Sequence, residues 1–318
     1  MNFKIKRFKN LPGGPLRKPK LFKRLYLFLK RLKYIKPTLA ETFIIPEKDV
    51  LEKYFQYKDE DTITWLGHST FLIKIDGKTI LTDPFLTDHA SPIEGLGPKR
   101  FSPPGLTIDK LPPIDIVLVS HDHYDHCDAK TIIHLANKAN IHVVVPLRLG
   151  ALFKKFGYKH IHELGWYDTW AFENLTIHGL PAYHYSKRNI FTHNVSLWAG
   201  YIIENGKKKI YFSGDTAYGS VFTEIGATYG PFDYALVSVG SYHPPELMLA
   251  SHLSPAQAVQ VGLDLGAKTL VAMHWGTLIL SDEPPLEPPI LFHQACEKAK
   301  YAAENIWILN IGETRKIS

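Results

Sequence analysis

An apolar strand followed at once by metal-binding types of side chain constrains this chain more than any other feature. The run 114–119 is continuous and β-branched, and it reads as a buried strand entered through two prolines. Three histidines and two aspartates then fall within six consecutive positions, as His121, Asp122, His123, Asp125 and His126. In α/β folds, sites lie where strands deliver polar residues at their carboxyl ends. The segment therefore predicts a site at the end of a strand.

The spacing His-x-His-x-Asp-His can supply ligands to two metal ions from one short loop. Neutral imidazole and carboxylate suit Zn²⁺, with iron or manganese as substitutes. Asp122 stands between two ligands, and we expect it to point away into solvent. Cys127 adjoins the loop, where a small buried side chain is favoured over a redox or ligand role. The alternative for the whole loop is a solvated histidine-rich segment without metal.

Three further candidates also follow predicted strands. They are His184 after the strand 175–177, Asp215 after 209–212, and His274 after 269–273. Gly214 permits a sharp turn, and a carboxylate at the next position has two oxygens that can bridge two cations. Each residue alone has a plainer interpretation, as a hydrogen-bonded loop histidine or a Gly-Asp turn. Together with the first loop they predict a two-metal site built from four strand ends.

Predicted strands and helices alternate in two successive halves of the chain. We expect strands at 62–66, 71–75, 79–82, 114–119, 143–145, 175–177, 196–203, 209–212, 234–239 and 269–273, and helices at 129–139, 147–156 and 254–265. Asp76-Gly77 signals a hairpin, and Ser254-Pro255 supplies the N-cap and first residue of the last helix. The Pro- and Gly-rich segment 90–113 reads as a surface loop bordering the site. The pattern predicts an α/β (α+β) sandwich of two sheets with helices outside, and a doubly wound parallel sheet is the alternative.

Charge is distributed unevenly along the chain. Residues 1–36 hold 13 Lys/Arg and no Asp/Glu, and the remaining 24 basic residues face 31 acidic ones. We therefore divide the chain into a basic arm, 1–45, and a domain, 46–318. Apolar residues of the arm recur at one-face helical spacing, as Leu21, Phe22, Leu25, Phe28, Leu29 and Leu32. This pattern is typical of an amphipathic helix on an anionic membrane surface, and packing on the domain or contact with nucleic acid are the alternatives.

The remaining composition is that of an ordinary globular protein, with 45% hydrophobic and 21% charged residues. No apolar run approaches the roughly 18 residues that span a bilayer, and lysines interrupt the apolar stretch of the arm, which argues against a secretory signal. The two cysteines are far apart in sequence and form no metal-binding pattern. A location in the reducing cytoplasm is consistent with them. We further expect the arm to lie on the inner face of the membrane. The oligomeric state is left open, a homodimer included.

The order of the candidate ligands resembles the metallo-β-lactamase superfamily of binuclear hydrolases, whose fold is an αββα sandwich. Eight stretches narrow the resemblance, namely 65–70, 81–84, 97–101, 111–126, 212–216, 230–233, 274–277 and 286–289. They are similar to the N-acyl-phosphatidylethanolamine-hydrolysing phospholipase D group, from about residue 60 to 315. The first loop and the His-Trp-Gly-Thr sequence at 274–277 are the most specific parts.

This resemblance implies two zinc ions and a role for each candidate. It assigns His121, His123 and His184 to one zinc, Asp125, His126 and His274 to the second, and Asp215 to a bridge between them. His252 would lie near the reacting phosphate without binding metal, and a histidine of a capping loop is the equal alternative. His68 would lie close to the site, hydrogen-bonding the ligand loop, and Asp83 would orient a ligand histidine.

The implied activity is hydrolysis of a phospholipid, N-acyl-phosphatidylethanolamine, to phosphatidic acid and an N-acylethanolamine, with Asp125, Asp215 and His252 as catalytic residues. A metal-dependent lactonase of the ascorbate-phosphate type, or a phosphodiesterase acting on a small soluble substrate, is the chemical alternative. Nucleic-acid processing is disfavoured by the acidic domain. A membrane-surface protein with a structural metal site is disfavoured because the seven candidate ligands include carboxylates and no cysteine.

Overall fold

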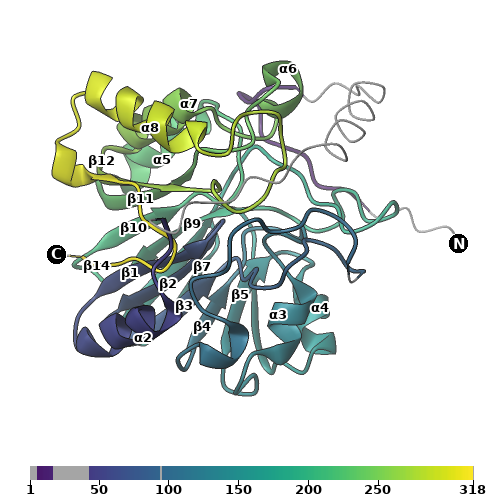
Figure 1. Cartoon of the computed structure of the whole chain (residues 1–318). Coiled ribbons are helices and arrows are strands. Elements are labelled where there is room, and N and C mark those ends of the chain that lie inside the picture. Colours follow the sequence, from purple (N-terminus) through teal and green to yellow (C-terminus); the bar gives the residue numbers. More distant parts are fainter. Residues whose placement is uncertain (1–5, 17–42, 94, 318) are drawn as a thin grey trace, which may run out of the picture.

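Two mixed sheets pack face to face, with helices on the outer surface of each (Figure 1). The computed structural model describes residues 6–16, 43–93 and 95–317. The amphipathic stretch 21–32 lies outside the described residues, so the division into a basic arm and a domain stays a prediction. The layered arrangement confirms the αββα sandwich and excludes a single doubly wound sheet.

Each sheet has seven strands within the described residues. The first has the order β14 (Thr314–Lys316), β1 (Thr62–Gly67), β2 (Thr70–Ile75), β3 (Lys78–Thr82), β4 (Ile116–Leu118), β5 (His142–Pro146) and β6 (His160–Leu164). The second has the order β13 (Ile306–Trp307), β12 (Ala267–Met273), β11 (Phe232–Ser238), β10 (Lys209–Phe212), β9 (Gly200–Glu204), β8 (Leu175–Leu180) and β7 (Thr169–Phe172).

Helices cover both sheets from outside. The first sheet carries α2 (Glu47–Gln56), α3 (Ala129–His134) and α4 (Gly150–Lys155), and the second carries α5 (Val221–Tyr229), α7 (Pro255–Leu265) and α8 (Glu287–Lys298) (Figure 1). Short turns of helix complete the chain as η2 (Ile108–Lys110), α6 (Pro245–Met248) and η3 (Ala303–Asn305). In the part of the chain that the structure describes, no helix is long and apolar enough to cross a bilayer.

Strand directions bring the carboxyl ends of several strands to one side of the sandwich. Because β2 is antiparallel to both β1 and β3, strands β1, β3 and β4 run in the same direction. Strand β9 is likewise antiparallel to β8 and β10, so β8, β10, β11 and β12 run together. The loops after these strands are therefore grouped at sheet edges, where α/β folds place their sites.

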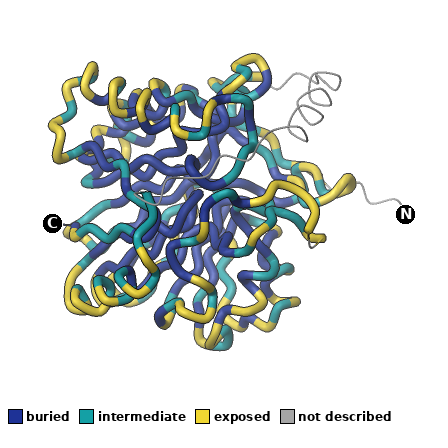
Figure 2. Tube along the Cα trace, viewed as in Figure 1, coloured by how far each residue is buried: buried dark blue, intermediate teal, exposed yellow. Residues whose placement is uncertain are grey.

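The sheets are buried on both faces (Figure 2). Strands β1 and β2 are buried at every position, because one face meets the second sheet and the other is covered. Trp65 and Tyr201 belong to the core that includes the space between the sheets, and Phe153 belongs to a second core under α3 and α4. Full burial of each such side chain contributes roughly 1.5–3 kcal/mol.

Most expected elements are present, and the differences have local causes. The hairpin after β2 turns at Asp76 and Gly77, both with positive φ (51° and 74°), as the Asp-Gly signal predicts. Ser254 caps α7 with Pro255 at the first helical position, also as predicted. The helix expected at 129–139 ends at His134, and the chain then turns through Asn137, whose φ is 61°. The strand expected at 196–203 begins only at Gly200.

Candidate metal centre

The candidate ligands follow strands of both sheets at their carboxyl ends. His68 follows β1, Asp83 follows β3, the loop 121–126 follows β4, His184 follows β8, Asp215 follows β10, and His274 follows β12. His68, Asp83 and His274 have positive φ angles of 53°, 33° and 67°, which are uncommon outside glycine and mark sharp turns directly after each strand. The backbone N–H of His274 donates to the carbonyl of His68 (2.9 Å), which joins the two sheets here.

Three imidazoles form a first group, in which one nitrogen each from His121, His123 and His184 lie within 4.8 Å of one another. Nδ1 of His184 donates to the carbonyl of Ser251 (2.8 Å), which leaves its Nε2 without a proton. The Ser120 hydroxyl donates its proton to Asp83, so its oxygen accepts from Nδ1 of His121 (2.9 Å). Nε2 of the neutral His121 ring therefore carries no proton either. Both Nε2 atoms face Nδ1 of His123, at 2.8 Å and 3.3 Å. Three imidazole nitrogens that converge in this way suit a cation.

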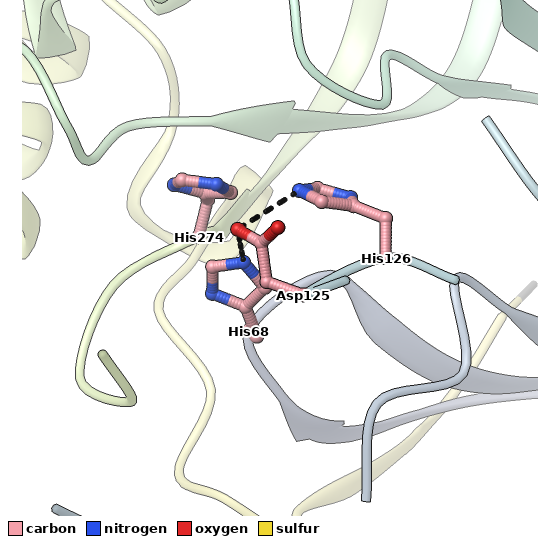
Figure 3. Close-up of side chains that lie close together, drawn as sticks. All are labelled: His68, Asp125, His126 and His274. Atoms are coloured by element: carbon pink, nitrogen blue, oxygen red, sulfur yellow. Dashed lines mark hydrogen bonds and ion pairs between the residues drawn. The ribbon is translucent and has the colours of Figure 1, made fainter. Parts of the chain in front are cut away.

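A second group contains His68, Asp125, His126 and His274, again with ligand atoms within 4.8 Å (Figure 3). Oδ2 of Asp125 lies 3.1 Å from Nε2 of His68 and 3.6 Å from Nε2 of His126. The rings of His68 and His274 are 4.1 Å apart between centroids. The carboxylate of Asp125 thus lies among three imidazoles supplied by both sheets.

Asp215 lies between the two groups. Its Oδ1 is 3.2 Å from Nε2 of His274, and its Oδ2 is 3.4 Å from Nε2 of His126 and 3.8 Å from Nε2 of His184. Nδ1 of His252 is 3.6 Å from the same Oδ2. This is the position that a bridging carboxylate requires, because its oxygens face donors from both groups.

Four buried polar atoms at this centre have no hydrogen-bond partner in the part of the chain that the structure describes. They are His126 Nε2, Asp215 Oδ1, His252 Nδ1 and His274 Nε2. Buried polar atoms without a partner are rare, because each one costs roughly 1–3 kcal/mol of desolvation. Grouped nitrogen and carboxylate donors in this state fit divalent cations, which would take up their lone pairs.

Burial keeps most of these imidazoles neutral. It lowers the pKa of His121 and His184 well below the ordinary value, and that of His68 to about 3. It also lowers the pKa of His252 to about 4. A neutral imidazole presents a lone pair, which is the form that binds metal.

The two carboxylates and His126 carry charge. Burial alone would raise the pKa of Asp215, but His274, His126 and His252 outweigh it and hold that pKa well below its usual range. The pKa of Asp125 is lowered in the same way, chiefly by His126 and His68 against burial. Burial lowers the pKa of His126, but Asp215 and Asp125 outweigh it and raise that pKa well above the ordinary value. The centre therefore holds anionic carboxylates among mostly neutral imidazoles, which favours a cation.

The centre opens into a cavity of about 430 Å³. Its polar side is lined by His123, Asp125, Asp215 and His252. Its apolar side is lined by Ala90, Pro98, Leu247, Met248 and Leu280. Since Ala90 and Pro98 belong to the segment 90–113, that loop borders the site as the sequence predicts. The cavity combines polar groups with apolar walls, a combination typical of small-molecule sites.

The structure brings together all seven predicted metal ligands and His252, while their individual roles stay predictions. Asp83 contacts a ligand histidine, as expected. Cys127 is fully buried, as favoured from sequence. The expectation that Asp122 points into solvent is wrong: it is 3% exposed and accepts from the backbone N–H of Lys187 (2.7 Å) and the hydroxyl of Ser196 (2.9 Å). It fastens the ligand loop to the following half of the chain.

His68 lies at the site and bonds the ligand loop, as the resemblance implies, through Nε2 at 3.1 Å from Oδ2 of Asp125. Its sequence signal is the same as for the candidate ligands, a histidine directly after an apolar strand. The carbonyl of Ser251, which receives the His184 proton, has no sequence signal, because any residue offers a carbonyl.

The family model described as β-lactamase superfamily domain matches residues 78–275. An uncharacterized protein of Mycobacterium tuberculosis is 40% identical over 233 residues, which cover 71% of this chain and 61% of that protein. N-acyl-phosphatidylethanolamine-hydrolyzing phospholipase D 1 of Caenorhabditis elegans is 38% identical over 237 residues, covering 71% of this chain and 67% of that enzyme. The chain thus spans about three fifths of the length of its mycobacterial relative.

The fold is also similar to a solved structure, that of Igni18, a metallo hydrolase of the archaeon Ignicoccus hospitalis. The TM-score is 0.60 at 22% sequence identity, with 81% of this chain and 98% of that chain covered. At this identity the likeness concerns the fold, and it agrees with the two-sheet sandwich described above.

Proposed function

Because this chain belongs to the β-lactamase superfamily, we propose that it is a metal-dependent hydrolase of that family, a phospholipase D that binds two zinc ions. Its proposed substrate is N-acyl-phosphatidylethanolamine, which it would cleave to phosphatidic acid and an N-acylethanolamine. The observation that carries the proposal is Asp215, whose carboxylate lies between two groups of imidazoles at the base of an open cavity. The Caenorhabditis elegans relative with this activity supports the choice of substrate.

The proposed ligands follow the two groups, except that His68 of the second group bonds Asp125 and is not a ligand. His121, His123 and His184 would hold one ion, and Asp125, His126 and His274 the other, with Asp215 shared. When bound, two divalent cations supply Lewis-acid chemistry, polarising a phosphoryl oxygen and lowering the pKa of water. Iron or manganese would fit the same nitrogen and carboxylate donors.

The side chains around the ligands hold and orient the reacting groups. Hydrolysis adds water across the phosphorus–oxygen bond on the ethanolamine side, so the hydroxyl goes to phosphorus and the proton to the departing alcohol. His252 lines the cavity beside Asp215. Since its pKa is lowered to about 4 by burial, His252 is neutral at pH 7 and has one N–H that can donate to a bound phosphate. His68 would keep the Asp125 carboxylate in place through the contact at 3.1 Å.

A lipid substrate is supported by the apolar surface around the cavity mouth. Seven described side chains are both large and apolar and at least 57% exposed, and four of them lie on two loops that flank the mouth. Ile93 and Leu96 lie between the lining residues Ala90 and Pro98, and Ile190 and Phe191 follow the lining residue Lys187. Exposed apolar side chains gathered at one site mark interaction surfaces.

This face and the basic arm would together meet a membrane surface. The exposed Lys99 and Lys187 flank the apolar loop tips, and the arm adds 13 basic residues without an acidic one. Anionic lipid attracts such residues by about 1 kcal/mol for each Lys or Arg near the surface. A peripheral position would raise the local concentration of a lipid substrate.

The first test is an assay on the purified, zinc-loaded protein with N-acyl-phosphatidylethanolamine in detergent micelles, with products identified by mass spectrometry. We expect release of N-acylethanolamine and phosphatidic acid that a chelator abolishes. Asp125→Asn and Asp215→Asn should each lower the rate by more than about a hundredfold, since each removes an anionic ligand. Asp59→Asn is the matched control, because Asp59 is exposed at the end of α2. Metal-loaded protein that leaves the lipid intact and hydrolyses a lactone or a soluble phosphodiester would refute the proposed substrate.

The second test measures binding to anionic liposomes. Replacing Lys23, Arg24, Lys30, Arg31 and Lys33 by glutamine should weaken sedimentation with the liposomes, and so should the double variant Ile190→Ser/Phe191→Ser. Hydrolysis of a soluble phosphodiester should be unchanged in both. Liposome binding at the level of the unmodified protein in both variants would refute the membrane contact.

A further inference from the structure

The segment 6–16, which we call the strap, lies across the loop that carries His184. The backbone N–H of Phe8 donates to the carbonyl of Asn194 (2.9 Å), and the Asn194 side chain donates back to the carbonyl of Phe8 (3.1 Å). Arg7 donates to the carbonyls of Phe191 (3.3 Å) and His193. The strap is therefore joined to the loop on the C-terminal side of His184. It lies outside the family match, which begins at residue 78.

Asn10 connects the strap to the candidate ligand itself. Its Oδ1 accepts from the backbone N–H of His184 (3.2 Å) and from Nε1 of Trp198 (2.9 Å), whose N–H is shared with the carbonyl of Ala182 (2.8 Å). Both partners are N–H donors, so the amide oxygen, not its nitrogen, must face them. Trp198 is 1% exposed, so Asn10 is anchored on a rigid part of the core while it holds the backbone of His184.

Tyr183, the residue before His184, is enclosed between the strap and the start of α5. A Cβ at Gly14 would lie 2.2 Å from Cδ1 of the Tyr183 ring, and a Cβ at Gly219 would lie 2.3 Å from its Cε2. Only glycine permits this approach on both sides. The Tyr183 hydroxyl also donates to the carbonyl of Pro12 (2.9 Å). Residues 12–14 are thus closely fitted to the ring beside the ligand.

His184 needs this support because it lies in a long irregular segment between β8 and β9. Its imidazole is fixed at one nitrogen by the carbonyl of Ser251, so that Nε2 faces His123 and Asp215. The ring keeps this direction only while the backbone of His184 keeps its place. In the structure, Asn10 Oδ1 is the acceptor for that backbone N–H.

We propose that the strap is part of the metal centre, with Asn10 as a positioning residue that sets the backbone of His184. The inference rests on the metal-binding role proposed for His184 and is independent of the substrate. Because the strap, 6–16, belongs to the basic arm, 1–45, this part of the arm lies beside a candidate metal ligand. Partners that orient metal ligands typically contribute about 10- to 100-fold to metal affinity.

The test compares full-length Asn10→Ala, Asn10→Asp and Lys9→Ala by competition for zinc with a chromophoric chelator. Asn10→Ala should weaken zinc binding by about 10- to 100-fold, whereas Asn10→Asp, which keeps an acceptor oxygen, should stay within about threefold of the unmodified protein. Lys9→Ala is the matched control, because Lys9 is an exposed neighbour on the same strap. The absorption spectrum of the cobalt-substituted protein should change in Asn10→Ala only, because it reports the geometry of the ligands.

A second variant keeps the result decisive if Asn10→Ala does not fold. Gly14→Ala leaves Asn10 intact but places a methyl group against Tyr183, so it should displace the strap and weaken zinc binding in the same direction. Unchanged zinc affinity and cobalt spectrum in a folded Asn10→Ala, or in Gly14→Ala where the first does not fold, would overturn the proposal. Unmodified protein that binds no zinc would instead refute the proposed function, so the two failures are distinguishable.

Discussion

Nδ1 of His126 lies 2.7 Å from Oδ2 of Asp83, and both side chains are completely buried. Asp83 also accepts from the backbone N–H and the hydroxyl of Ser120, both at 2.6 Å. With three donors around it, the carboxylate requires the His126 proton on Nδ1. Nε2 of His126 faces Asp215, and a metal bound there would replace the second proton of this charged imidazole.

Asp83→Asn should weaken metal binding without touching a proposed ligand. An asparagine has one oxygen for the three donors, and its NH₂ group would face either His126 Nδ1 or Ser120. The His126 proton would then shift to Nε2, where it blocks the metal. We expect a loss of about 10- to 100-fold in zinc affinity, measured by chelator competition.

Asp115→Asn is the control for that substitution. Asp115 also accepts from a backbone N–H, that of Thr79 (2.8 Å), but it lies at the amino end of β4, away from the ligands. It should leave zinc affinity unchanged. Equal effects of the two substitutions would mean that Asp83 acts only through general stability.

His68 should make the metal-free protein sensitive to acid. Burial lowers its pKa to about 3, whereas an unfolded histidine titrates near 6.5. At a pH between these two pKa values, His68 is protonated in the unfolded state and neutral in the folded state. The free energy of unfolding therefore falls as the pH falls. The slope from one such group is at most about 1.4 kcal/mol per pH unit.

His68→Gln, which keeps a donor for Asp125, should reduce this slope. The measurement is urea unfolding of the metal-free protein at pH 6.5 and 5.0 for both proteins. His134→Gln is the control, because His134 is exposed at the end of α3, where its Nδ1 donates to the carbonyl of Lys130 (2.7 Å). The prediction is contradicted if His68→Gln and the unmodified protein lose the same free energy on acidification.

Strand-end ligands could be predicted from sequence because strand and ligand are adjacent in the chain. A His or Asp directly after an apolar run is identified both as a candidate ligand and as the residue at the end of a strand. The parallel directions of the strands then bring their carboxyl ends together. The αββα architecture followed from the same alternation of strands and helices, together with the family resemblance.

Contacts between distant segments could not be predicted in this way. Asn10 and His184 are 174 positions apart, and a single asparagine in a basic arm gives no sign of its partner. The burial of Asp122 could not be predicted either, because the groups that donate hydrogen bonds to it, the backbone N–H of Lys187 and the hydroxyl of Ser196, come from another loop. Helix α8 is not among the expected helices; its first turn contains Pro288 and Pro289, which are tolerated there because the N–H groups of a first turn have no helical acceptor.

The two thiols should be unreactive in the folded protein. Cys127 and Cys296 are completely buried, and burial raises the pKa of each to about 12. At pH 8 about one thiol in ten thousand would be ionised, and the thiolate is the reactive form. Iodoacetamide followed by mass spectrometry should label neither cysteine in native protein and both in denaturant. Rapid labelling of Cys127 alone would show that the loop carrying His126 opens in solution.

Ser254→Ala should destabilise the fold and leave the metal centre intact. The Ser254 hydroxyl accepts from the backbone N–H of Gln257 (3.3 Å), and the Gln257 side chain accepts from the backbone N–H of Ser254 (3.0 Å), which makes a capping box at the start of α7. Loss of such a cap costs about 1 kcal/mol of unfolding free energy, to be measured by urea titration.

Gln260→Ala is the control for the cap, since it removes an exposed pair with Asp264 (2.8 Å) in the same helix and should cost less than about 0.5 kcal/mol. Zinc affinity should be unchanged in both variants. The cap lies three residues after Ser251, whose carbonyl receives the His184 proton. A loss of zinc affinity in Ser254→Ala alone would therefore contradict the prediction and show that the helix cap also positions this carbonyl.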